Sequence, residues 1–140
     1  MVKRISIEDQ DRYYSLGSLI KDDFGKFYSL DDLLNRSYIY IFGYYDKDKL
    51  VGFIHVSKSY EVIDIDNIVV DSDYQRKGIA KELLNYIFNY FEDATSYILE
   101  VREDNKAAIN LYKSFDFKVI NKRDKYYDDV DAFIMRKNVI

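Results

Sequence analysis

The chain has 140 residues, enough for one domain with a single core, and 48% of them are hydrophobic. Its net charge of −4 argues against a general nucleic-acid-binding protein, because such proteins present a basic face to the phosphates. The absence of cysteine excludes disulfides, thiolate metal sites and cysteine nucleophiles, and no metal site is expected. No apolar run could span a bilayer and no signal-peptide pattern is present, so we expect a cytoplasmic protein without a membrane or nucleic-acid partner.

The first half of the chain predicts four strands, with two helices between the first and the second strand. Alternating and apolar runs indicate strands at residues 2–7, 38–45, 49–57 and 61–70. A helix is expected over residues 8–20, and Ser29 is typical of the capped start of a second, short helix. His55, the only histidine, lies inside an expected strand, so we assign it a structural role.

A glycine turn that follows the fourth strand carries the strongest functional signal. The strand ends in Ile68, Val69 and Val70, and the segment Gln75-Arg76-Lys77-Gly78-Ile79-Ala80 then opens an amphipathic helix over residues 78–92. The unpaired N–H groups and the positive dipole end of such a helix suit a phosphate or pyrophosphate. The spacing fits neither the phosphate loop of nucleotide hydrolases nor the dinucleotide fingerprint. The alternative is a surface turn with solvated basic residues.

A second unit of strand, turn and helix follows. Residues 97–101 indicate a buried strand that contains Glu100 near its end. A carboxylate in such a strand costs stability unless it is paired, so Glu100 is either a functional group or the partner of Arg102 or a lysine. Asn105 is placed to cap a helix whose apolar stripe would be Ala108, Leu111, Tyr112 and Phe115. Residues 117–122 and 131–137 then predict an antiparallel pair of strands.

From about Leu50 to the C-terminus these motifs resemble the GNAT superfamily of acetyl-CoA-dependent N-acetyltransferases. The branch that they resemble most is that of the bacterial ribosomal-protein-alanine acetyltransferases, the RimI type. The segments that carry this resemblance are Leu99-Glu100-Val101-Arg102, Asn105, Ala108-Ile109, Leu111-Tyr112, Lys125-Tyr126-Tyr127, Asp131-Ala132 and Met135. The resemblance implies a single domain over residues 1–140, of the mixed α/β class. Its three layers would be a central, mostly antiparallel sheet of six or seven strands flanked by about four helices.

The same resemblance implies acetyl-CoA as cosubstrate and assigns roles to particular residues. Glu100 would be the general base and Tyr112 the general acid of a direct transfer, while Tyr126 and Tyr127 would bind the acceptor. The residues implied to contact the cofactor are Ile68, Val69, Val70, Arg76, Lys77, Gly78, Ile79, Ala80, Lys81 and Asn105. Capping its helix is an equally simple role for Asn105. Asp116 stands where the family usually has glycine, and aspartate can adopt a positive φ there at some cost.

The acceptor of the acetyl group stays open among three alternatives. The paired tyrosines and the Asp131-Ala132-x-x-Met135 segment favour a protein N-terminus, with the N-terminal alanine of a ribosomal protein as the first expectation. A small amine, such as a polyamine, an amino sugar or an antibiotic, is the second alternative. A non-catalytic module that binds CoA is the third, and the presence of both Glu100 and Tyr112 argues against it. The sequence makes no prediction of the oligomeric state.

Overall fold

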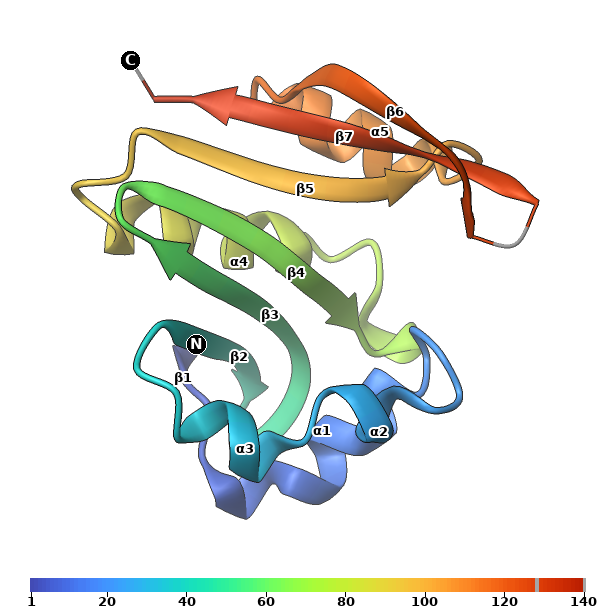
Figure 1. Ribbon diagram of the computed structural model, residues 1–140. Coiled ribbons are helices and arrows are strands. Elements are labelled where there is room, and N and C mark those ends of the chain that lie inside the picture. Colours follow the sequence, from blue (N-terminus) through green and yellow to red (C-terminus); the bar gives the residue numbers. More distant parts are fainter. Residues whose placement is uncertain (128, 140) are drawn as a thin grey trace. The chain divides into compact units, whose positions relative to one another are not determined.

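The fold is a mixed β-sheet accompanied by helices (Figure 1). It is seen in a computed structural model that describes residues 1–127 and 129–139, and the side chains of residues 125–127 are not described. In this described part of the chain, seven strands form one sheet in the order β1-β2-β3-β4-β5-β7-β6. The strands are β1 (Val2–Arg4), β2 (Ile39–Asp46), β3 (Lys49–Ser59), β4 (Val62–Val70), β5 (Ser96–Arg102), β6 (Lys118–Tyr127) and β7 (Val130–Asn138). The pairing is parallel between β4 and β5 and antiparallel for β1–β2, β2–β3, β5–β7 and β6–β7. The expected fold class is therefore confirmed.

Five α-helices and two 3₁₀ turns accompany these strands in the described residues. They are η1 (Ile7–Asp9), α1 (Gln10–Gly17), α2 (Phe24–Phe27), α3 (Leu30–Leu34), η2 (Ser72–Tyr74), α4 (Ile79–Tyr90) and α5 (Lys106–Ser114). Not one of the helices described is long and apolar enough to cross a membrane. The chain divides into two compact units, the first made of Met1–Ser57 and Asn67–Glu92, the second of Lys58–Asp66 and Asp93–Ile140. That all 140 residues act as one acetyltransferase domain stays a prediction.

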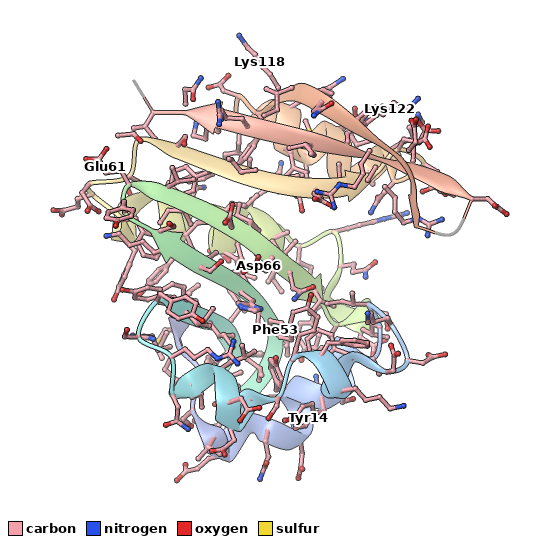
Figure 2. The ribbon with its side chains drawn as sticks, viewed as in Figure 1. Tyr14, Phe53, Glu61, Asp66, Lys118 and Lys122 are labelled. Carbon is pink, nitrogen blue, oxygen red and sulfur yellow. The ribbon has the colours of Figure 1, made fainter. Side chains whose placement is uncertain are left out.

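The first unit packs helices on both faces of strands β2 and β3. Neighbouring strand residues point to opposite faces, so the rings of Phe53 and Phe42 lie on different sides of the paired strands. Phe53, labelled in Figure 2, contacts Tyr13 of α1 and Phe24 of α2, with ring centroids 4.9 and 6.2 Å away. On the other side, Phe42 packs against Tyr90 of α4 at 4.9 Å. Aromatic side chains thus hold α1 and α2 on one face and α4 on the other.

Helix α4 follows its sequence pattern closely. Its expected apolar stripe is buried, each member at most 5% exposed: Ile79, Leu83, Leu84, Ile87 and Phe91. Gly78 is the N-cap residue with φ 80°, a left-handed conformation that favours glycine. The helix ends at Tyr90, two residues earlier than expected.

The second unit combines one parallel and two antiparallel pairings. Strand β4 contributes Val62–Ile65, which pair with Ser96–Leu99 of β5, and β7 lies between β5 and β6. In helix α5, the ring of Tyr112 meets that of Phe117, the residue before β6, edge-on at 5.7 Å. At the end of α5, Asp116 has φ 70°, so the position does need the left-handed backbone that glycine usually supplies.

Three expectations about the local structure are wrong in detail. Strand β1 ends at Arg4 and α1 covers residues 10–17, because the 3₁₀ turn η1 occupies residues 7–9. Ser29 is the N-cap residue of α3, but its hydroxyl makes no capping bond; instead the Leu30 N–H donates to the hydroxyl of Tyr14 at 2.9 Å. The single-turn α2 was not expected, because four residues are too few to show a helical period.

The stripe of α5 also differs from expectation. Tyr112 is buried as expected, but Ile109 is its buried companion, while Ala108, Leu111 and Phe115 are only half-buried. This nine-residue helix therefore buries a narrower face than the full stripe of its apolar residues.

Candidate functional site

The first unit contains the glycine turn that the sequence marks as an anion site. Arg76 and Gly78 both have positive φ, 65° and 80°, on either side of Lys77. The first backbone bond of α4 runs from the Glu82 N–H to the Gly78 carbonyl at 3.0 Å, so the amides of residues 79–81 precede the helical ladder. Successive main-chain N–H groups in such a turn form a concave site for an oxyanion. The residues present therefore fit a pyrophosphate.

The side chains of this turn divide into two groups. Arg76, Lys77 and Lys81 are exposed and bring three positive charges to the start of α4. Ile79 is only 4% exposed and belongs to the core, so it can offer a ligand only its main chain. Ala80 is half-buried, as are Ile68, Val69 and Val70 at the end of β4. The Gln75 side-chain amide donates to the Val70 carbonyl at 3.3 Å and ties the turn to the strand before it.

An ion pair that the sequence did not reveal braces the same segment. Arg12 of α1 lies 2.7 Å from Asp71, the residue after β4, and also donates to the Leu50 carbonyl at 3.0 Å. Asp71 accepts a bond from the Asp73 N–H at 2.9 Å and so caps η2. The Arg12 hydrogen bond, followed by that backbone bond, lowers the pKa of Asp71. Because 59 residues separate Arg12 from Asp71, no local sequence signal could have paired them.

The second unit contains Glu100. It lies on β5 directly after the last residue that pairs with β4, and its side chain is 28% exposed. Its Oε1 is 3.1 Å from Nη2 of Arg123 on β6. Arg102, the structural partner considered from the sequence, instead pairs with Asp104 through two bonds of 3.0 Å. Glu100 is thus ion-paired, but across the sheet and not along its own strand.

Tyr112 and Asn105 lie in the same unit as Glu100. Tyr112 is 6% exposed on α5. Asn105 caps that helix, because its Oδ1 accepts a bond from the Ala108 N–H at 3.2 Å. Capping uses the carbonyl oxygen, so a contact to a cofactor would fall to the NH₂ group of the same side chain.

The two expected acceptor residues, Tyr126 and Tyr127, lie on β6 with side chains outside the described residues. Glu100, Asn105 and Tyr112 all belong to the second unit. Ile68, Val69, Val70 and residues 76–81 all belong to the first. The roles of all these residues stay predictions.

His55 occupies the interior of the first unit, in keeping with the structural role expected for it. It is 2% exposed, its Nδ1 accepts a bond from the Asn67 side-chain amide at 3.4 Å, and the ring of Tyr28 meets it edge-on at 5.7 Å. Burial lowers its pKa from 6.5 to about 4. No cluster of acidic or histidine side chains in the described part of the chain could hold a metal ion.

Comparison of this sequence with known proteins finds a family and several relatives. The model of the acetyltransferase (GNAT) family matches residues 6–117. An N-alpha-acetyltransferase RimI of Mycobacterium tuberculosis is 37% identical over 98 residues, 64% of this chain and 60% of that protein. The ribosomal protein bS18-alanine N-acetyltransferase of Escherichia coli is 41% identical over 68 residues, 47% of this chain and 46% of that protein.

The crystal structure of the Escherichia coli ribosomal-protein-S18-alanine N-acetyltransferase is also similar. It superposes with a TM-score of 0.89 at 26% identity and covers 99% of this chain and 93% of that one. The chain belongs to the acetyltransferase (GNAT) family, which confirms the resemblance found in its sequence. It spans about half the length of the curated relatives it matches.

Proposed function

We propose that this protein is an acetyl-CoA-dependent N-alpha-acetyltransferase that acts on a protein N-terminus. The observation that carries the proposal is the similarity, at 37% and 41% identity, to two relatives named for this activity. The finer proposal for the acceptor is the N-terminal alanine of a ribosomal protein, after the name of the second relative. Glu100 and Tyr112, the two groups that the chemistry needs, support an enzyme over a module that only binds CoA.

In the proposed reaction the acceptor amine attacks the thioester carbonyl directly. The amine nitrogen forms the new C–N bond and loses a proton to Glu100, while the C–S bond breaks and the leaving sulfur takes a hydrogen bond or proton from the Tyr112 hydroxyl. An α-amino group has a pKa of about 8, so roughly a tenth of it is already neutral near pH 7. The base therefore corrects a deficit on the order of 1 kcal/mol, which a carboxylate can do directly or through one water.

The proposed cofactor contacts follow from the chemistry of the two units. The main-chain amides of residues 79–81 and the side chains of Arg76, Lys77 and Lys81 would hold the pyrophosphate. The main chain of Ile68, Val69 and Val70 would accept the pantetheine arm as an added strand. The Asn105 NH₂ group would make one further contact, while Tyr126 and Tyr127 would contact the acceptor N-terminus.

A panel of acceptors tests the proposal. Peptides that differ only in their first residue are assayed for release of free CoA, beside spermine and an aminoglycoside, and mass spectrometry locates the acetyl group. We expect acetylation of the α-amine, with peptides that begin with alanine among the best. Glu100→Gln and Tyr112→Phe should each slow the transfer. Acetylation of lysine side chains or of small amines alone would contradict an N-terminal acceptor.

A further inference from the structure

The ion pair on Glu100 has a consequence for the proposed reaction. The carboxylate of Glu100, the proposed base, is already ion-paired in the protein without substrate, since Nη2 of Arg123 lies 3.1 Å from its Oε1. A substrate ammonium that approached Glu100 would therefore meet a positive charge already in place. The side chains are 28% and 49% exposed, so the pair is accessible to solvent and to an incoming amine.

The sheet register explains how two strands that are not neighbours can share this pair. Ala132 of β7 is opposite both Arg102 of β5 and Arg123 of β6, so all three side chains point to one face. Glu100 precedes Arg102 by two residues and shares that face. On β7, which lies between β5 and β6, Ala132 is opposite Arg123 and Ile134 is opposite Glu100, so the pair reaches diagonally across this strand. Ala132 is 0% exposed, and a larger side chain there would obstruct the arginine.

Other charges at this end of the second unit have their own partners. Arg102 binds Asp104 through two bonds of 3.0 Å. Lys122, labelled on β6 in Figure 2, lies 3.0 Å from Asp131 and 3.4 Å from Glu103. Lys122 therefore fastens β6 to its neighbours as Arg123 does, without touching Glu100. This makes Lys122 a matched control for Arg123.

We propose that Arg123 is a positioning residue that orients the Glu100 carboxylate and selects the neutral form of the acceptor amine. This inference rests on the proposed function. A guanidinium binds a carboxylate in a defined orientation, so it would aim the proton-accepting oxygen. A fixed positive charge beside the base also disfavours a second cation there, which lowers the fraction of bound amine that is protonated. The first effect acts through Glu100 and sets kcat, the second acts on the amine directly and sets KM, and Arg123 itself transfers no proton.

Steady-state kinetics with an alanine-first peptide test this role. In Arg123→Gln we expect kcat to fall about tenfold, because the base is no longer aimed. We expect the KM for the peptide to fall about threefold in the same variant, because the ammonium form now binds without repulsion. A substitution that only destabilised the fold would lower kcat and raise KM. Lys122→Gln, with the same loss of charge on the same strand, should stay within about twofold of the parent in both constants.

Two further variants sharpen the test. Arg123→Lys keeps the charge but not the planar fork, so its KM should be unchanged and its kcat should lie between those of the parent and Arg123→Gln. In a Glu100→Gln background, Arg123→Gln should change kcat by no more than about twofold, because its effect passes through the missing carboxylate. Should Arg123→Gln fail to fold in a thermal melt, Arg123→Lys decides the question: a kcat below the parent's at unchanged KM supports the role, and a kcat equal to the parent's overturns it.

The outcomes separate this inference from the function on which it rests. Equal effects of Arg123→Gln and Lys122→Gln, a raised KM, or additive losses in the double variant would overturn the role of Arg123 while acetylation by the parent protein continues. A parent protein that acetylates no peptide would overturn the proposed function first, and this inference with it.

Discussion

At the scale of single residues, Tyr112 combines a packing position with a proposed chemical role. Its ring is 6% exposed and meets Phe117 edge-on, which any aromatic residue could reproduce. A phenol of pKa about 10 is a weaker acid than a thiol of pKa about 8.5, so full proton transfer to the sulfur is uphill by about 2 kcal/mol. The hydroxyl would therefore act first as a hydrogen-bond donor to the developing thiolate.

Tyr112→Phe separates these two roles. Because the ring stays, the midpoint of thermal unfolding should change little, while kcat should fall about a hundredfold and the KM for acetyl-CoA should stay within about twofold. The control is Tyr97→Phe, which removes the hydroxyl of a tyrosine 1% exposed in the same unit, and whose kcat should match the parent's. Unchanged turnover in Tyr112→Phe would remove this residue from the mechanism.

At the scale of elements, the turn into α4 depends on a backbone conformation more than on a side chain. Gly78 has φ 80°, and a Cβ added there would meet no atom within 4 Å. An alanine is thus disfavoured by backbone strain alone and not by a clash. The Arg12–Asp71 pair and the bond from Gln75 to Val70 hold the segment that leads into this turn.

Gly78→Ala should therefore disturb the proposed pyrophosphate site before it disturbs the fold. We expect a loss of about 1 kcal/mol in the free energy of unfolding. We also expect a several-fold higher KM for acetyl-CoA, because the turn relaxes and its amides lose their common direction; chemical denaturation and initial rates measure the two effects. Gly25→Ala in α2 is the control, since a Cβ there would make only an ordinary contact, 3.4 Å from the Tyr14 ring. Equal KM values in the two variants would contradict the role of the Gly78 turn.

Asp71→Asn tests the role of the Arg12–Asp71 ion pair. The substitution keeps the shape of the side chain but removes the charge that Arg12 binds at 2.7 Å. Since the Arg12 side chain is 34% exposed, solvent screens the pair, and we expect a stability loss of about 1 kcal/mol or less. The KM for acetyl-CoA should rise with little change in kcat, because the segment that leads into the turn is less firmly held. A lower kcat at constant KM would show that the Arg12–Asp71 ion pair affects a step other than acetyl-CoA binding.

At the scale of the whole molecule, the local patterns predicted much of the fold but not its long-range ion pairs. The stripe of α4, the cap at Asn105 and the antiparallel pair of β6 and β7 could be predicted, because these patterns are local in the sequence. The pairs Arg12–Asp71 and Arg123–Glu100 could not, because strand order and register bring their members together. The same reason applies to the start of α3: the hydroxyl that accepts a bond from its first N–H, that of Leu30, belongs to Tyr14 of α1 and not to the neighbouring Ser29.

The stability of the whole molecule should depend on His55 in mildly acidic solution. Its folded pKa of about 4 lies below the unfolded value of 6.5, so the unfolded chain binds a proton more readily between these values. Stability is therefore fully present above pH 6.5 and is lost as the pH falls toward 4. The complete loss is about 3 kcal/mol, of which about 2 kcal/mol is lost by pH 5.

Urea unfolding of the parent and of His55→Gln between pH 7.5 and pH 5 measures this loss. Paired carboxylates such as Asp71 have lowered pKa values and titrate in more acidic solution in both proteins, so the difference between the two curves reports His55. The difference should shrink by about 2 kcal/mol as the pH falls from 7.5 to 5. Because His55 is the only histidine, its ring signals in NMR follow its protonation directly, whatever the stability of the variant. An imidazole that titrates near 6.5 in the folded protein would contradict the buried, neutral state described for it.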